Sequence, residues 1–571
     1  MPADVRWWVF VALATAAALL LRLDDLALRS IAHTEIYVPG IPLPEGLTEP
    51  PARLTLRDVL WFHFHDEPHP MGWYLMMFGW TGLAGTSEWA LRVPSALFGA
   101  ASVPAVFLLT RRIFGTPAAA MAAVLLAAHG FHVYWSQTAR MYVPGAFWAM
   151  LSTWLLVTMA QSRGPRPQAE AGYVLATLAG LQTTELCLPG LLVQVVWAAL
   201  FLAPAPAPGR RAALRGRPTV PRVLQVQAIA LMLSVPGFAQ AIYRARKEAA
   251  APPSLEFLQE YLSFGFLYAH ESFASPEIRL AAPLVLALAV AGIAAIVAGL
   301  RAGRPERGLK PASGPLPRWL APVVAVSAAA LVLWFAAIAH RRNGYLLVLA
   351  AFPVAGLAVP RLALAARAAI VALAGGHDGW LRRRDPFVAL LAVLGLLLPL
   401  ALFVVSFKAS VLAPRAFLVL VPYLLVLAAG GVVAGLRPAA LRAAAAAGLT
   451  ALFALSVPFN AAKPVSPNDY KSLAFQLRAA IQPGDVIFLR ARQWADSPLL
   501  YYLRDVPVVT ENQAADVAAG RYPRLWLVTW PDDAGKVRLG PRQDAVAGLT
   551  PVSELRALRA RAVLYVPGPA P

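Results

Sequence analysis

The segment LRVPSALFGAASVPAVFLLTRR, from Leu91 to Arg112, decides the fold class of this chain. The part from Leu91 to Thr110 carries a single charged side chain, and Arg111 and Arg112 follow it directly. A helix needs about 20 mostly apolar residues to cross the hydrocarbon core of a bilayer. The segment is therefore predicted to span a membrane, with the arginine pair at its cytoplasmic end.

Similar apolar runs recur along the first 460 positions. The chain has 571 residues, is 59% hydrophobic and 14% charged, and has a mean hydropathy of +0.60. Because an average soluble protein is about 25% charged, these values predict a polytopic, mostly α membrane protein. The N-terminal run is expected to remain as an uncleaved first span, since it lacks a convincing small-residue cleavage site. The expected spans, thirteen in all, are 7–23, 91–110, 116–130, 144–160, 171–187, 189–203, 223–243, 280–300, 319–338, 344–360, 386–406, 416–436 and 441–458.

The distribution of charge fixes the expected orientation. With the N-terminus in the cytoplasm, the arginines gather in the cytoplasmic loops, and the acidic residues gather in 24–90 and 244–279 on the other side. This arrangement follows the positive-inside rule. The formal net charge of +20 therefore indicates topology and contact with lipid headgroups, and it gives no reason to expect nucleic acid.

Residues 171–203 are expected to form two short spans. A single helix of this length would measure about 50 Å, well beyond a hydrocarbon core of about 30 Å. Pro189-Gly190 favours a turn within it, and a single span would place the flanking arginine loops, 163–166 and 210–222, on opposite faces of the membrane.

Residues 1–460 are predicted to form the membrane domain, with 24–90 as its first extracytoplasmic loop. In 461–571 the long apolar runs stop, and helix-like segments alternate with the strand-like segments DVIFLR, VPVVT, RLWLVTW and AVLYVP. This rhythm predicts a small extracytoplasmic α/β domain. No nucleotide-binding motif is present. Cys187 is the single cysteine, which excludes an intrachain disulfide.

Ionisable residues gather at the predicted outer ends of the spans. Because charged groups at membrane depth cost about 2.5–3.5 kcal/mol each on insertion scales, they tend to face a cavity and to have a role. Carboxylates and cations around one cavity would suit an anionic lipid substrate. The residues concerned are Glu35, the 63–69 cluster, 137–142, Glu185, 340–342, Lys408 and Arg415.

Several motifs resemble those of bacterial glycosyltransferase family 39, the protein-mannosyltransferase-like and aminoarabinose-transferase-like members of the GT-C superfamily. They are HPMGWYLMMFGW, SEWALRVPSALFGAASVPAVFLLTRRIFG, FHVYWSQTARMY and APRAFLVLVPYLLVLAAGG. The resemblance is strongest over roughly 7–160 and returns at 408–436. It implies an integral-membrane transferase of GT-C type that uses a polyprenyl-phosphate-linked sugar at an extracytoplasmic site.

The resemblance implies a catalytic acidic pair soon after the first span. The matching positions here are Thr34 and Glu35, so the glutamate is kept and a threonine replaces the aspartate. A second departure is Thr138, where many relatives carry a glutamate. Glu35 is therefore the first candidate for the base that removes the acceptor proton, and Asp66 and Glu67 are the alternatives.

Cations are needed to hold the departing polyprenyl phosphate, whose charge grows in the transition state. The candidates are Arg140, Lys408 and Arg415. Gln137 and Tyr142 are expected to hydrogen-bond the sugar or the phosphate. His69 is placed among the substrate-binding residues, at the His-Pro turn that leads into a juxtamembrane helix of the family.

A metal site is the competing interpretation of the stretch FHFHDEPHPMGWY, Phe62–Tyr74. His63, His65 and His69 could supply ligands together with the two carboxylates. His63 and His65, however, are two positions apart, a spacing that suits a strand, and no standard zinc spacing is present. The sequence therefore gives no indication of a metal or other cofactor, although it does not exclude a divalent metal.

Three functions remain open at this stage. The first is an inverting transferase in the inner membrane, acting on a polyprenyl-phosphate sugar and an extracytoplasmic protein, lipid or glycan. The second is a flippase or transporter of polyprenyl-linked lipids, against which the lack of an inverted repeat argues. The third is a non-catalytic GT-C-like scaffold, which the threonines at 34 and 138 would permit.

Overall fold

The fold is taken from a computed structural model of the chain. It describes residues 3–36, 38, 41, 55–65, 69–162, 164–202, 221–245, 361–365, 367–369, 385–406, 418–436, 438–461, 469–489, 497–531, 537–539, 543–558 and 560–568. Four of the predicted site residues therefore lie outside the described residues: Asp66, Glu67, Lys408 and Arg415.

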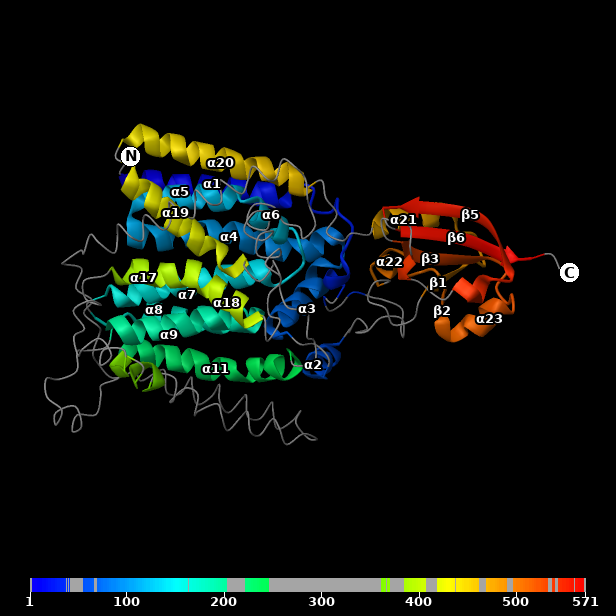
Figure 1. The fold of residues 1–571 in the computed structure, drawn as a ribbon, viewed down its shortest axis with the longest axis horizontal. Helices are drawn as coiled ribbons and strands as arrows, with labels where there is room; N and C mark the ends of the chain where they lie inside the picture. The colour runs from blue at the N-terminus through cyan, green and yellow to red at the C-terminus, as the bar shows by residue number, and fades with distance from the viewer. Residues whose placement is uncertain are drawn as a thin grey trace.

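A bundle of helices forms the larger part of the molecule, and an α/β unit lies at one end of it, which we call the tail end (Figure 1). The elements of the bundle are α1 (Ala3–Leu23), η1 (His33–Glu35), α2 (Leu56–His65), α3 (Gly72–Ala84), α4 (Glu88–Phe114), α5 (Thr116–Ala128), α6 (Gly130–Ser136), α7 (Tyr142–Ala160), α8 (Pro167–Thr183), α9 (Cys187–Leu202), α11 (Arg222–Ala245), α17 (Pro386–Ala392), the π-helix η4 (Val393–Leu397), α18 (Leu398–Ser406), α19 (Val421–Gly435) and α20 (Ala439–Ala461).

Many of these helices match the predicted spans closely. Among the described residues, α1, α4, α7 and the continuous helix over Pro386–Val404 are long and apolar enough to cross a membrane. The pair α5–α6, bent by 57°, makes a fifth if it counts as one span. The apolar helices α9, α11, α19 and α20 are shorter within the searched residues. Three predicted spans, 280–300, 319–338 and 344–360, lie outside the described residues, so the count of thirteen stays a prediction.

Residues 171–203 form two helices as predicted, but the break lies elsewhere. Helix α8 ends at Thr183 and α9 begins at Cys187, so the turn falls before Pro189-Gly190. Pro189 lies in the first turn of α9, where the missing amide hydrogen of proline breaks no helical hydrogen bond. The prediction that Pro189-Gly190 forms the turn was wrong, and this displacement places Glu185 in the turn.

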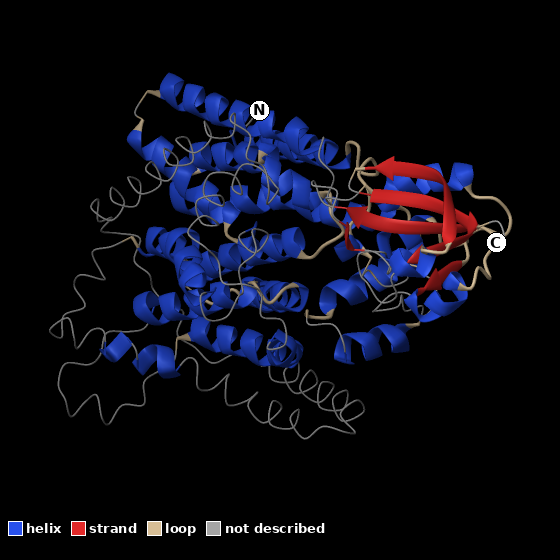
Figure 2. Ribbon diagram, turned by 45° about the vertical axis from the view of Figure 1, so that its right-hand side comes forward, coloured by secondary structure: helices blue, strands red, loops and turns tan. Residues whose placement is uncertain are grey.

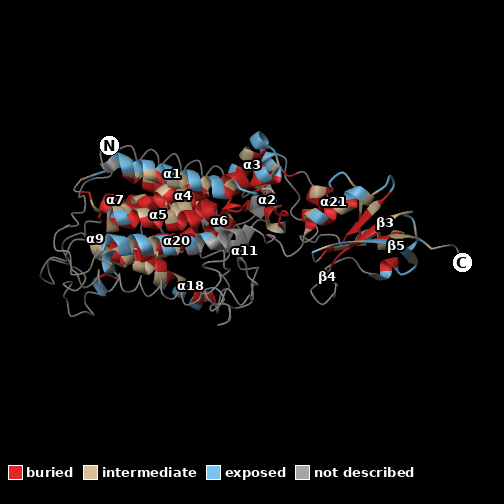
Figure 3. Ribbon diagram, turned by 90° about the horizontal axis from the view of Figure 1, so that it is seen from above, coloured by how far each residue is buried: buried red, intermediate tan, exposed pale blue. Residues whose placement is uncertain are grey.

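The bend between α5 and α6 is held by Arg22 at the end of α1. Its guanidinium donates to the carbonyls of Leu126 (3.3 Å) and Ala127 (3.1 Å) at the end of α5, and to Ser136 Oγ (3.2 Å). Gly99 of α4 makes room, since a Cβ there would lie 2.2 Å from Ser136 Oγ and 2.7 Å from Arg22 Nε. Buried residues concentrate along α4, α5 and α6 (Figure 3), and this core fixes where α6 ends and the stretch 137–142 begins.

The α/β unit contains a six-stranded sheet with the order β2-β1-β3-β6-β5, and β4 pairs with β3 (Figure 2). Strand β1 is parallel to β2 and β3, whereas β6 is antiparallel to β3 and β5. Its elements are α21 (Tyr470–Ala480), β1 (Val486–Leu489), α22 (Ser497–Tyr502), β2 (Val508–Thr510), η6 (Glu511–Gln513), α23 (Ala514–Ala518), β3 (Leu525–Pro531), β4 (Val537–Leu539), η7 (Gln543–Val546), β5 (Leu549–Ala557) and β6 (Ala560–Pro567).

Side chains alternate between two cores on opposite faces of this sheet, as the period of a strand requires. Ile487 and Trp526 pack with α21 and α22 on one face, whereas Phe488 and Leu527 pack with α23 and η7 on the other. The four strand-like segments predicted from the sequence are β1, β2, β3 and β6. Strands β4 and β5 were not predicted.

Asp485 anchors the turn that leads into β1. Its side chain is fully buried and accepts hydrogen bonds from Arg524, from Trp526 Nε1 (2.8 Å) and from the Gln482 amide (3.1 Å). Burial opposes ionisation, but the hydrogen bonds from Arg524 and Trp526 outweigh it and hold the pKa of Asp485 below its usual value of 3.8.

Asp485→Asn is expected to destabilise the unit by about 1–3 kcal/mol at pH 7, since buried donors lose a charged acceptor. A carboxylate with a lowered pKa stabilises the fold above its unfolded pKa, and this contribution is lost as the pH falls through the folded pKa. The difference in melting temperature between the wild type and the variant should therefore be largest near pH 7 and become smaller below about pH 3.8. A difference that stays constant to pH 3 would contradict this assignment.

Candidate functional site

Glu35, the first predicted base, lies fully buried at the end of η1. Arg92 of α4 donates from Nε to Oε1 (3.0 Å) and from Nη2 to Oε2 (2.9 Å). The amide of Ala139 donates to Oε1 (2.8 Å) and that of Ala32 to Oε2 (2.9 Å). A carboxylate offers about four acceptor positions, and here four donors occupy them.

Arg92 uses its remaining donors on the segment that precedes Glu35. It donates to the carbonyls of Leu26 (2.9 Å), Arg29 (3.0 Å) and Ser30 (3.1 Å). Burial opposes ionisation of Glu35, but the charge and hydrogen bonds of Arg92 and the two amides hold the pKa of Glu35 below its ordinary value. This geometry favours a structural role for Glu35, in place of the role of base that the resemblance implies.

Arg140, the predicted phosphate cation, is placed by the same turn. Its Nη1 donates to the carbonyl of Thr34 (2.8 Å) and lies 3.5 Å from the Tyr74 hydroxyl, and its guanidinium lies 5.7 Å from the centre of the Tyr142 ring. The residue is 6% exposed. Glu35 thus helps to place Arg140 in two ways. It accepts a hydrogen bond from the amide of Ala139, which precedes Arg140, and it follows Thr34, whose carbonyl accepts from the Arg140 guanidinium.

The side chain of Gln137 makes its hydrogen bonds to other groups within the protein. Its amide donates to the carbonyl of Asp24 (2.9 Å), and its Oε1 accepts from Arg29 Nη2 (3.0 Å). Thr138 is fully buried and donates to the carbonyl of Tyr134 (3.2 Å). Both residues therefore shape the turn between α6 and α7, and the predicted contact of Gln137 with a sugar has no support in this geometry.

His69 and Glu185 form an accessible acid–base pair beside Arg140. His69 Nδ1 lies 3.2 Å from Glu185 Oε1, and the two side chains are 25% and 37% exposed. Burial opposes ionisation of Glu185, but the charge and hydrogen bond of His69, assisted by the charge of Arg140, hold its pKa below the ordinary value. Glu185 is therefore a carboxylate that solvent can reach and whose pKa the charge of Arg140 helps to lower.

The turn before α3 reaches the end of α8 because of Gly72. A Cβ at Gly72 would lie 2.6 Å from the carbonyl oxygen of Gln182, which is closer than any ordinary contact. Glycine therefore lets the two backbones meet and brings His69 against Glu185. Sequence reasoning noted Glu185 only as one polar residue among several at span ends. The available signal was a carboxylate inside the predicted apolar span 171–187.

Among the residues that the structure describes, no group of three or more His, Cys, Asp or Glu side chains is placed to bind a metal ion together. The side chains of His63 and His65 belong to the residues left undescribed, as do Asp66 and Glu67. Of the predicted site residues, the structure brings together Glu35, Gln137, Arg140 and Tyr142, with His69 facing Glu185 nearby.

Comparison with known proteins gives one family and several solved structures. Residues 66–204 match the family model described as dolichyl-phosphate-mannose-protein mannosyltransferase. ArnT from Cupriavidus metallidurans, solved bound to undecaprenyl phosphate, is 18% identical over 99% of each chain, with a TM-score of 0.43. The oligosaccharyltransferase AglB from Archaeoglobus fulgidus, in complex with an inhibitory peptide and a dolichol-phosphate, is 12% identical over 95% of this chain and 74% of that chain, with a TM-score of 0.42. No curated protein matches the chain.

The family match covers the stretch in which three of the four quoted motifs lie, namely those that begin at His69, Ser87 and Phe131. It also covers His69, Arg140 and Glu185. The match confirms the resemblance that these motifs indicate. Over residues 66–204 the chain is therefore similar to the dolichyl-phosphate-mannose-protein mannosyltransferase family, as these motifs indicate.

Proposed function

We propose that the protein is an inverting glycosyltransferase of the inner membrane that moves a sugar from a polyprenyl-phosphate donor to an extracytoplasmic acceptor. The observation that carries this proposal is the placement of a fixed cation, Arg140, beside an accessible carboxylate–imidazole pair, Glu185 and His69. The description of the matching family supports the donor class, since dolichyl phosphate mannose is a polyprenyl-phosphate-linked sugar.

The chemistry divides between these groups. The acceptor oxygen attacks the anomeric carbon while the bond from that carbon to the phosphate oxygen breaks, and the bonding electrons leave with the phosphate. Arg140 binds the phosphate of the donor and still holds it as it leaves. The acceptor proton passes to the His69–Glu185 pair, in which the carboxylate orients the imidazole. Glu35 positions Arg140, and no metal is needed in this scheme.

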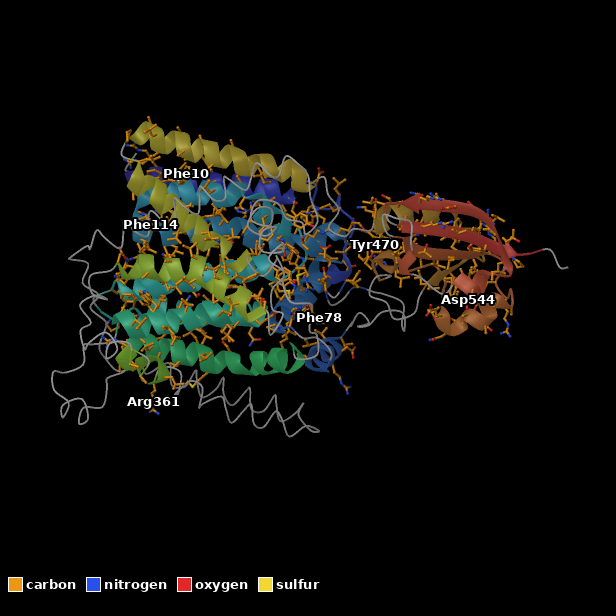
Figure 4. The ribbon with its side chains drawn as sticks, viewed as in Figure 1. Phe10, Phe78, Phe114, Arg361, Tyr470 and Asp544 are labelled. Atoms are coloured by element: carbon orange, nitrogen blue, oxygen red, sulfur yellow. The ribbon has the colours of Figure 1, made fainter. Side chains whose placement is uncertain are left out.

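The side of the membrane follows from charge. Arg111 and Arg112 lie in the last turn of α4, next to Phe114, which lies toward the end of the bundle opposite the tail end (Figure 4). Because arginine-rich ends face the cytoplasm, we place the tail end and the C-terminal unit outside the cytoplasm.

Incubation of the purified protein with labelled polyprenyl-phosphate sugars and extracytoplasmic acceptors tests this function. Transfer of label that survives EDTA supports the proposal as written, and transfer that EDTA abolishes would overturn the metal-free scheme. Movement of the lipid between leaflets without transfer would establish the flippase instead. If neither transfer nor lipid movement is observed with any donor or acceptor, the protein is the non-catalytic scaffold.

Arg140→Gln is expected to raise the donor KM by about 10- to 100-fold, because a hydrogen bond to a charged group contributes about 1.5–3 kcal/mol. Arg140→Lys should recover part of this loss, since the charge remains while the planar fork is lost. Arg561→Gln in the C-terminal unit, where the side chain is 41% exposed, serves as a control. An unchanged donor KM in Arg140→Gln would assign the phosphate to other cations, of which Lys408 and Arg415 are the predicted ones.

A further inference from the structure

The C-terminal unit is fastened to the helix bundle at Glu88, the first residue of α4. Lys471 of α21 donates to Glu88 Oε2 (2.6 Å) and to the carbonyl of Ala27 (2.6 Å). The hydroxyl of Tyr502, at the end of α22, donates to Glu88 Oε1 and accepts from the amide of Ile31 (2.8 Å). Tyr470, which precedes Lys471, lies at the side of the unit nearest the bundle (Figure 4).

These contacts are sheltered from solvent. The Glu88 side chain is 10% exposed and that of Lys471 is 22% exposed, while burial and the negative charge of Glu88 raise the pKa of Tyr502 well above its usual value. Ion pairs removed from water are screened far less than surface pairs. The junction is thus more than a loose surface contact.

The junction continues directly into the candidate site. Glu88 and Arg92 are four residues apart on α4 and therefore lie on the same face, one turn from each other. Arg92 binds Glu35, which binds the amide of Ala139, and the carbonyl of Thr34 holds Arg140. Ile31, whose amide binds Tyr502, lies in the same short segment. Tyr502 thus binds the peptide that joins Ser30 to Ile31, Arg92 binds the carbonyl of the same peptide, and the backbone of this segment continues to the Thr34 carbonyl that holds Arg140.

We propose that the C-terminal unit positions Arg140 through Glu88, Lys471 and Tyr502. These three are positioning residues: each acts on the donor phosphate through segment 26–36 and Arg92. This inference rests on the proposed function for the role of Arg140, but the mechanical link between the unit and the segment stands independently of it. The competing interpretation is a packing contact that keeps the unit in place without any effect on the site.

Tyr502→Phe in the full-length protein separates these interpretations, because it removes both hydroxyl contacts and keeps the ring. We expect faster hydrogen exchange of the Ile31 amide and of segment 29–36, a donor KM about tenfold higher in line with the loss of hydrogen bonds to charged groups, and a kcat within about twofold of the wild type, since the chemical groups are untouched. Tyr565→Phe is the matched control, because Tyr565 packs against the core on the opposite face of the sheet.

Lys471→Met should reproduce the effect, and Lys471→Arg, which keeps the charge, should restore most of the donor KM. This second pair keeps the test valid if Tyr502→Phe does not fold. Unchanged exchange in segment 29–36 would overturn the link. Faster exchange with an unchanged donor KM would overturn the positioning role and establish a packing contact. Faster exchange in a protein whose wild type transfers no sugar would refute the proposed function and leave the link standing.

Discussion

Glu185→Gln is expected to lower kcat for glycosyl transfer by about 10²- to 10⁴-fold, the range over which a positioned acid or base contributes. The amide keeps the shape of the side chain and can still hydrogen-bond His69, but it cannot stabilise a positive charge on the imidazole. Donor binding should change little, because Arg140 keeps its contacts with Thr34 and Tyr142. Single-turnover transfer from a labelled donor, with the donor KM measured in parallel, checks both parts.

The control for this variant is Glu554→Gln, which makes the same chemical change on β5 of the C-terminal unit. His69→Gln should lower kcat to a similar extent as Glu185→Gln, and the double variant should be little worse than either single one, because residues that act as a unit are not additive. Full activity in Glu185→Gln, together with loss in Asp66→Asn or Glu67→Gln, would return the base to the alternatives predicted from the sequence.

Much of the bundle could be predicted because a long run of apolar residues is a local property of the sequence. The segments at 386–406 and 441–458 differ from the observed helices by at most three residues at either end. The turn near Pro189 was misplaced because proline marks the first turn of a helix as readily as a break. Strand β5 escaped prediction because its side chains are largely exposed and carry no clear alternation.

The site was harder to predict because its decisive contacts join distant residues. Glu35 is predicted as the base because it matches the family's acidic pair after the first span, whereas the residues that bind it, Arg92 and Ala139, are 57 and 104 residues away. Nothing local signals that Arg92 and Ala139 fill its acceptor positions. The pairing of His69 with Glu185 bridges 116 residues and depends on the close approach at Gly72. Sequence reasoning thus selected residue types and one end of the bundle, whereas the contacts between these residues depend on packing that the sequence does not display.

Glu35→Ala is expected to lower the free energy of unfolding by about 3–5 kcal/mol, the range for breaking a buried ion pair by removing one partner. Arg92 would then remain buried without its carboxylate, and the amides of Ala32 and Ala139 would lose their acceptor. Arg92→Met should cause a loss of similar size, because it leaves the carboxylate of Glu35 buried instead. Thermal unfolding in detergent, followed by tryptophan fluorescence, measures both effects.

The double variant Glu35→Leu/Arg92→Met separates a structural role from a catalytic one. Replacing a buried ion pair by apolar side chains of similar volume is often nearly neutral for stability, so the double variant should melt closer to the wild type than either single variant. If Glu35 is structural, the double variant should also recover part of the transfer activity that Glu35→Ala loses, because the segment around Thr34 is again packed. If Glu35 is the base, no recovery is possible, since the proton acceptor is gone in both variants. A double variant that regains stability and yet transfers no sugar would therefore restore Glu35 to the catalytic role and reduce the His69–Glu185 pair to a binding contact.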